Sequence, residues 1–342
     1  MTEQQKRNLM FGAAGVGALL LAQAWRRRSD YDFTGRSVVL TGGSRGLGLV
    51  IARQLTDEGA RLALVARSAE ELDRAAEDIR RRQPFAEVLT IAGDVRHRDD
   101  VERAIAQAHE RFGSIDVLIN NAGIIQVGPV AHMTLADYQE AMDTHFWGPL
   151  YGIMAALPHM REQGGGRIVN ISSIGGRIAV PHLVPYSASK FALTGLSDGL
   201  GYELARHNIH VTTVCPGLMR TGSPLNATFK GRHPQEFAWF AISDSLPLAT
   251  IDATRAARQI LDACRRGDPE LVITVQAKLA ILARTMAPEL FARAMSMINS
   301  LLPPPTGVDG NRTRLGRESQ SEWAPSKLTT STYRAALENN EM

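Results

Sequence analysis

The sequence predicts an α/β fold built on a doubly wound parallel sheet of about seven strands. Short apolar, β-branched segments alternate with longer amphipathic ones from residue 36 onward, a pattern typical of parallel sheets with helices on both faces. A glycine-rich turn follows the first apolar segment and precedes a helix. Ligands of such sheets bind beyond the carboxyl ends of the strands, so we expect the functional residues in the loops that follow them.

Each element is placed by its own pattern. Strands are expected where apolar and β-branched residues cluster, at 37–40, 61–66, 87–91, 117–119, 167–171, 210–214 and 271–273. Helices are expected in the amphipathic segments between them, at 47–58, 69–82, 99–112, 135–161, 185–206 and 252–265. No change of composition divides these elements, so residues 31–275 are predicted to form one catalytic domain.

The composition is that of an ordinary globular protein and excludes some partners. The 342 residues are 44% hydrophobic, and 38 basic against 35 acidic residues give a net charge of +3. This balance argues against a nucleic-acid surface. The two cysteines, Cys215 and Cys264, lack the spacing of a metal site or a disulfide framework, so neither is predicted.

The N-terminal segment, residues 1–30, departs from this picture. Residues 9–25 form a run of 17 residues, apolar except for Gln23, with basic residues on both sides. This length is at the short limit for a membrane-spanning helix. An uncleaved membrane anchor is favoured, with the catalytic domain facing the cytoplasm because more basic residues follow the run than precede it. A cleaved signal peptide and an apolar arm packed on the protein are the alternatives.

The C-terminal region is predicted in two parts. Residues 276–302 read as an apolar helical extension that Pro288 breaks or kinks. This extension could be a lid, an oligomer contact, a membrane-surface element or an additional core helix. Residues 303–342 are rich in proline, glycine and polar side chains, which predicts an extended or flexible tail.

The turn "VVLTGGSRGLG" indicates a site for the phosphates of a dinucleotide. Gly42, Gly46 and Gly48 allow a tight turn and a close approach of the backbone to phosphate, whose charge the N–H groups of the next helix would bind. The context of a strand before and a helix after is that of a Rossmann-type fold.

The end of the second strand predicts which dinucleotide binds. Ala66 stands eighteen residues after Gly48, near where an acidic residue would hold the ribose of NAD, and Arg67 follows it. Arg45 lies within the glycine turn itself. Two guanidiniums without a carboxylate favour the 2′-phosphate of NADP, unless both arginines simply face solvent.

The segment "YSASK" places Tyr186 and Lys190 four residues apart, so on a helix both lie on one face. Ser173 follows a predicted strand, thirteen residues before Tyr186, where its hydroxyl can hydrogen-bond a substrate oxygen. A lysine ammonium beside a phenol, together with the positive charge of a nicotinamide, favours the phenolate, so we expect a lowered pKa for Tyr186. The tyrosine could then exchange a proton with an alcohol or carbonyl oxygen.

Taken in order, these motifs closely resemble those of the short-chain dehydrogenase/reductase family over about residues 36–275. The resemblance implies catalysis by Ser173, Tyr186 and Lys190 and hydride transfer with a nicotinamide. It also implies a homodimer or homotetramer. Its cofactor-binding residues would be Gly42, Ser44, Arg45, Gly46, Leu47, Gly48, Arg67, Asp94, Val95, Asn121, Ala122, Gly123, Tyr186, Lys190, Pro216 and Gly217.

One position departs from the family pattern. In "DTHFWGPL", His145 stands where the family usually has an asparagine that helps to hold a proton-relay water. An imidazole could hold a water or shuttle a proton, since its pKa lies near neutrality. His145 is therefore a candidate catalytic residue, and a harmless substitution is the alternative.

The expected function is interconversion of an alcohol and a ketone or aldehyde with NADP(H). Apolar segments at 124–133 and 174–185, and an insertion at 218–248 that contains Phe229, Phe237, Trp239 and Phe240, favour a lipophilic substrate. These segments could instead form an oligomer contact. The competing class is a non-catalytic NADP-binding scaffold or redox sensor, which the intact Ser173, Tyr186 and Lys190 oppose.

Overall fold

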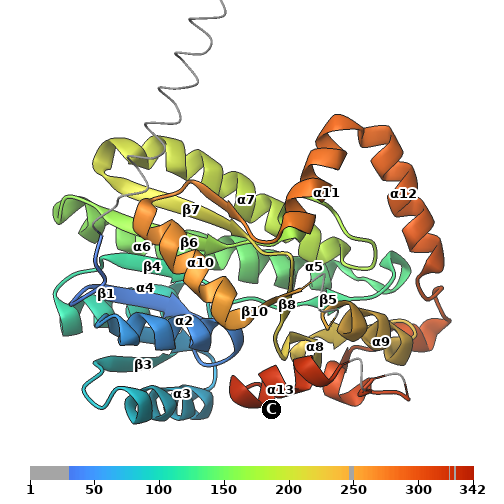
Figure 1. Cartoon of the computed structure of the whole chain (residues 1–342), viewed down its shortest axis with the longest axis horizontal. Helices are drawn as coiled ribbons and strands as arrows, with labels where there is room; N and C mark the ends of the chain where they lie inside the picture. The colour runs from blue at the N-terminus through green and yellow to red at the C-terminus, as the bar shows by residue number, and fades with distance from the viewer. Residues whose placement is uncertain (1–30, 246–249, 323, 327–328) are drawn as a thin grey trace, which may run out of the picture.

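A seven-stranded parallel sheet forms the centre of the computed structural model, which describes residues 31–245, 250–322, 324–326 and 329–342 (Figure 1). The strand order is β11-β7-β6-β4-β1-β2-β3. This confirms the predicted α/β sheet, with every predicted strand present. The strands are β1 Ser37–Thr41, β2 Arg61–Ala66, β3 Val88–Ala92, β4 Val117–Asn120, β6 Gly166–Ile171, β7 Ile209–Cys215 and β11 Glu270–Val272.

The chain reverses its direction across the sheet at β1. This strand pairs with β2 on one side and with β4 on the other, both in parallel. At its carboxyl end Thr41 lies between Val65 of β2 and Asn120 of β4. Such a switch point opens a crevice in which α/β sheets bind their ligands.

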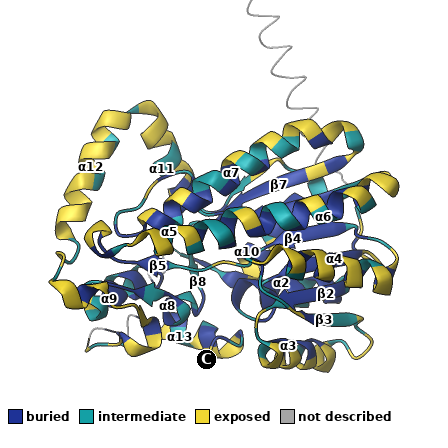
Figure 2. Ribbon diagram, turned by 180° about the vertical axis from the view of Figure 1, so that it is seen from behind, coloured by how far each residue is buried: buried dark blue, intermediate teal, exposed yellow. Residues whose placement is uncertain are grey.

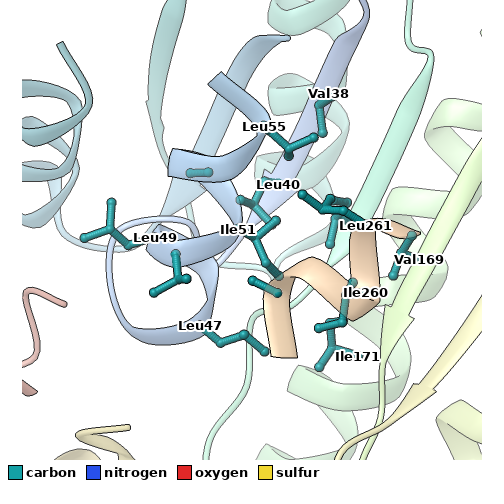
Figure 3. Packing of buried hydrophobic residues seen from close by; sticks show 14 of the residues in the cluster. Val38, Leu40, Leu47, Leu49, Ile51, Leu55, Val169, Ile171, Ile260 and Leu261 are labelled. Atoms are coloured by element: carbon teal, nitrogen blue, oxygen red, sulfur yellow. The ribbon is translucent and has the colours of Figure 1, made fainter. Parts of the chain in front are cut away.

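Helices cover both faces of the sheet. Figure 1 shows α2 and α10 in front of it, and Figure 2, from behind, shows α4, α6 and α7. In the packing between α2, α10 and the strands, Ile51 and Leu55 meet Ile260 and Leu261 (Figure 3). The helices that cover the sheet are α2 Gly46–Asp57, α3 Ala69–Arg82, α4 Arg98–Phe112, α6 Gly148–Glu162, α7 Val184–Leu204 and α10 Ala253–Arg266.

The helix predicted at 135–161 has an internal irregularity. It consists of α5, Leu135–Met142, one π-helical turn, Asp143–Trp147, and α6. A π turn accommodates one additional residue per turn and often marks a functional site. It contains His145 and lies beside α7, which carries Tyr186.

The apolar extension forms two helices, α11 Val275–Met286 and α12 Pro288–Leu301, with the break at the expected proline. They project from the body in Figures 1 and 2. The side chains of Leu279, Met286, Leu290 and Leu301 are largely exposed, so the alternative of an additional core helix is wrong.

A smaller module lies beyond the carboxyl ends of the strands, beside the sheet. Its own apolar core includes Phe229, Phe237 and Ala336. Its elements are β5 Gln126–Val127, β8 Leu218–Arg220, α8 Ser223–Asn226, β9 Thr228–Phe229, α9 His233–Ser243, β10 Thr250–Asp252, β12 Arg314–Leu315 and α13 Thr330–Glu338.

The expectation of an extended or flexible tail at 303–342 is corrected by this module. Strand β12 pairs antiparallel with β9, and Ala324 and Ala336 are fully buried in the apolar core. Small side chains allow the segment to pack closely although its composition is polar, and side-chain hydrogen bonds fix its end. The boundaries at 275 and 302 stay predictions.

The predicted membrane association is also corrected. Across residues 31–245, 250–322, 324–326 and 329–342, no helix is long and apolar enough to cross a membrane. The run at 9–25, on which the prediction of a membrane-associated protein facing the cytoplasm depended, lies outside the described residues.

Candidate active site

A cavity of about 440 Å³ lies at the carboxyl ends of the strands, between the sheet and the smaller module. It brings together every predicted site residue, although these come from eight separate loops and helices. Its lining includes Gly42, Ser44, Arg45, Gly46, Leu47, Gly48, Arg67, Asp94, Val95, Asn121, Ala122, Gly123, His145, Ser173, Tyr186, Lys190, Pro216 and Gly217.

The glycine turn lies at one end of the cavity and tolerates no side chain at two positions. Gly42 has a φ of +66°, and a Cβ there would lie 2.8 Å from the Cα of Ala122. A Cβ on Gly48 would collide with the carbonyl oxygen of Gly42. Asn121 supports the turn, because its side-chain amide donates to the carbonyl oxygens of Thr41, at 3.2 Å, and Gly42, at 3.0 Å. The turn therefore presents its backbone to the cavity.

The two arginines expected at a 2′-phosphate have different surroundings. Arg67 is exposed at the rim of the cavity. Arg45 forms an ion pair of 3.0 Å with Glu71, and the hydroxyl of Ser44 donates to the same carboxylate. Glu71, in the first turn of α3, therefore neutralises part of the positive charge at this end.

Two further pairs of expected cofactor-binding residues, Asp94-Val95 and Pro216-Gly217, also contact other groups of the protein. Asp94 forms an ion pair of 2.7 Å with Arg96, and Val95 packs against Gly148 in the first turn of α6. Pro216 accepts a hydrogen bond from the backbone N–H of Ile174, which ties the Pro216-Gly217 turn to the loop that carries Ser173.

Tyr186, Ser173 and Lys190 meet at the other end of the cavity. Tyr186 and Lys190 lie on the first turns of α7, and the Lys190 Nζ is 5.7 Å from the centroid of the phenol ring. Lys190 is only 4% exposed, and its ammonium donates to the carbonyl oxygen of Ile171 at 2.8 Å. Lys190 is thereby fixed beside the end of β6.

Burial shifts the pKa values of Tyr186 and Lys190 in opposite directions. Burial raises the pKa of Tyr186 to about 12, although its hydrogen bond with Ser173 acts in the opposite direction. Burial likewise lowers the pKa of Lys190 from its ordinary 10.5 to about 7. Burial thus keeps the phenol protonated at neutral pH. The lowering expected when Lys190 and a nicotinamide act together stays a prediction.

His145 is buried, and both of its ring nitrogens are engaged. Nε2 accepts from the backbone N–H of Ile124 at 3.1 Å, and Nδ1 lies 2.7 Å from the Ser189 hydroxyl. That hydroxyl donates to the carbonyl oxygen of Tyr186, so Nδ1 carries the proton. Burial, with the Lys190 charge, lowers the pKa of His145 well below 6.5. The ring also meets Tyr186 edge-on, with centroids 5.4 Å apart.

Three carboxyl groups at the cavity were not identified from the sequence. They are Glu71, Asp244 at the end of α9, and Glu341 near the C-terminus. Burial raises the pKa values of Asp244 and Glu341 to about 7. An acidic residue in the first turn of a helix that follows the second strand could have indicated Glu71. No local pattern indicates the other two, because the chain returns to the site from a distance.

The cavity therefore joins the glycine turn to a Ser-Tyr-Lys group, an arrangement typical of oxidoreductases that use a nicotinamide cofactor. The profile of the short chain dehydrogenase family matches residues 36–228. The chain is 32% identical over 293 residues to the dehydrogenase/reductase SDR family member 7B of Bos taurus, covering 84% of this chain and 88% of that protein. It belongs to the short-chain dehydrogenase/reductase family.

Solved structures agree with this assignment. Levodione reductase superposes with a TM-score of 0.63 at 29% identity, over 72% of this chain and 99% of that chain. An L-sorbose reductase from Gluconobacter frateurii, complexed with NADPH and L-sorbose, gives a TM-score of 0.64 at 25% identity over 71% and 97%.

Proposed function

We propose that this protein is an NADP(H)-dependent reductase and dehydrogenase that interconverts a ketone or aldehyde and the corresponding alcohol on a lipophilic substrate. The main observation in support is that Ser173, Tyr186 and Lys190 lie at one end of the cavity and the glycine turn lies at the other end. This placement lets one bound cofactor extend from the turn to the tyrosine.

The residues present fit such a cofactor. The backbone of the glycine turn at the start of α2 would hold its phosphates. Arg67 would bind the 2′-phosphate of NADP, with Arg45 in support, and no acidic residue stands at Ala66. Glu71 opposes this preference for NADP because it pairs with Arg45, so Arg67 is expected to be the main residue that binds the 2′-phosphate. The L-sorbose reductase structure, which contains NADPH, supports the same choice.

The chain's own residues would handle the proton. When bound, the nicotinamide supplies or accepts a hydride at the substrate carbon. The Ser173 hydroxyl donates to the carbonyl oxygen and orients it. The phenol of Tyr186, kept protonated by burial, gives its proton to that oxygen as the alcohol forms, and takes a proton back in oxidation. Lys190, fixed by Ile171, stabilises the phenolate that remains.

His145 has a positioning role in this proposal. Its two ring nitrogens bind Ile124 and Ser189, so the ring fixes the start of α7 and the orientation of Tyr186. A role in a proton relay through a held water is not favoured, because that role needs a ring nitrogen directed at the water.

The substrate end of the cavity favours an apolar molecule. Trp239 and Phe240 of α9 line it, with Val180, Leu183 and Met219. Phe229 and Phe237, which the sequence also suggested, are fully buried in the module core and form no part of the wall. A mostly apolar wall with few polar groups suits a hydrocarbon body that carries one carbonyl or hydroxyl group.

The test is consumption of NADPH by the full chain with a panel of lipophilic ketones and aldehydes, followed by absorbance at the reduced nicotinamide band. Turnover on an apolar carbonyl, with a lower KM than on a polar sugar ketone, is expected. Tight NADPH binding with no turnover on the panel would instead favour a non-catalytic sensor.

A further inference from the structure

The last four residues of the chain lie against the phosphate-binding turn. The backbone N–H of Gly46, the first residue of α2, donates to the carbonyl oxygen of Asn339 at 2.9 Å. The Glu341 carboxylate accepts from the backbone N–H of Gly222 at 2.6 Å. A Cβ on Gly46 would lie only 3.0 Å from the same carboxylate. A carbonyl oxygen and a carboxylate therefore occupy the positions that bind an anion.

Several side chains hold this segment in place. Arg53 donates to the Asn339 side chain at 2.8 Å and to the carbonyl oxygen of Glu338 at 2.9 Å. Asn340 donates to the carbonyl oxygen of Ser44 at 2.9 Å and accepts from Arg74. Arg74 belongs to α3, and Asn226 of α8 donates to the carbonyl oxygen of Glu341 at 3.1 Å. The contact is thus built from both parts of the molecule.

The negative charge of the Glu341 carboxylate is disfavoured where it lies. It is 7% exposed, and burial raises its pKa to about 7. Glu71 lies near the same turn and repels it, whereas Arg45 attracts it. Met342, the next residue, is 63% exposed, so its own side chain does not hold the segment in the cavity. These four residues can leave without disturbing α13, which Ala336 anchors in the module core.

We propose that residues 339–342 act as an internal competitor for the cofactor phosphates, so that the C-terminus must leave the glycine turn before NADP(H) binds. The proposal rests on the proposed function and concerns the regulation of the same site. One backbone N–H of Gly46 cannot serve both the Asn339 carbonyl and a phosphate. A carboxylate next to a pyrophosphate is also a like-charge contact in a poorly hydrated place.

The experiment compares NADPH binding by the full chain and by a variant that ends at Glu338, using the fluorescence of the reduced cofactor. The shortened variant is expected to have a Kd at least fivefold lower. Two controls keep the competitor in place: deletion of the exposed Met342 alone, and Glu338→Gln, whose side chain is exposed. Both are expected to bind NADPH as the full chain does, within about twofold.

Amide hydrogen exchange in the unshortened chain gives a second readout that does not depend on the folding of the variant. Exchange at residues 339–342 should become faster when NADPH is added. An unchanged or higher Kd on shortening, or slower exchange of the C-terminus with NADPH, would show that the segment completes the site and would overturn the competition. Failure of both chains to bind NADPH or NADH would reject the proposed function, and the competition with it.

Discussion

At the residue scale, Lys190 is a buried amine that carries a penalty for its charge. Its pKa in the folded protein is about 7, below its ordinary 10.5, so the folded state binds fewer protons than the unfolded chain between these values. The free energy of unfolding therefore rises with pH through this window, and the full penalty applies below pH 7.

Lys190→Met should remove that rise. Between pH 7 and 9 the free energy of unfolding of the wild type is expected to increase by about 2 to 3 kcal/mol more than that of the variant. Urea unfolding at each pH measures it. Asp244 and Glu341, whose pKa values are raised to about 7, change the free energy of unfolding below this pH window. Tyr186, whose pKa is raised to about 12, changes it above the window. Equal slopes for the two proteins would show that Lys190 is not desolvated.

Arg67 is expected to set the cofactor preference. Arg67→Ala should raise the Kd for NADPH by about 10- to 100-fold, because the charge-assisted hydrogen bonds to the 2′-phosphate are lost. The Kd for NADH, which lacks this phosphate, should change little. Arg81→Ala is the matched control, because Arg81 is an exposed arginine on α3 with a weak 3.8 Å ion pair. An equal loss for both cofactors would assign Arg67 to a general electrostatic role.

The candidate site could be predicted to this extent because its residues follow strands or open helices. Gly46, Arg67 and Ser173 each lie within a few residues of the carboxyl end of a strand, where the fold brings separate segments together. Glu341 could not be found in this way. It reaches the turn from a segment whose composition indicates no structure, and the packing of Ala336 and long-range hydrogen bonds such as that of Asn340 to Ser44 return it to the site.

At the scale of elements, α2 is fixed by its buried face. Ile51 is fully buried between the sheet and α10, so Ile51→Ala should lower the free energy of unfolding by about 2 to 5 kcal/mol. Leu135→Ala, at a position 89% exposed on α5, is the control and should change it by less than about 0.5 kcal/mol. Similar losses in urea unfolding for both variants would contradict the packing described.

The strands and most helices were predictable because the periodic spacing of their apolar residues can be recognised in a single sequence. The π turn at Asp143–Trp147 was not, since one additional residue in a turn leaves the apolar pattern of a long helix nearly unchanged. That turn decides the surroundings of His145. An imidazole at this position could therefore be noticed in the sequence, but its hydrogen bonds to Ile124 and Ser189 could not be derived.

At the scale of the whole molecule, the cavity joins the sheet to the smaller module, so a cofactor should stabilise both. NADPH at a hundred times its Kd should add about 2.7 kcal/mol to the free energy of unfolding and raise Tm by roughly 3 to 5 °C. Thermal unfolding of the full chain with and without NADPH measures this. A single transition that shifts as a unit is expected, whereas two transitions of which one shifts would show that the parts unfold independently.

The most direct test of the central claim is the kcat for NADPH-dependent carbonyl reduction by Tyr186→Phe. Because the substitution removes only the phenolic hydroxyl, which donates the proton, kcat should fall by at least about 100-fold while the Kd for NADPH stays within about threefold of the wild type. Tyr202→Phe is the matched control on the same helix, 80% exposed, and should leave both values unchanged. A wild-type kcat in Tyr186→Phe would contradict the account, because the proton would then come from another group.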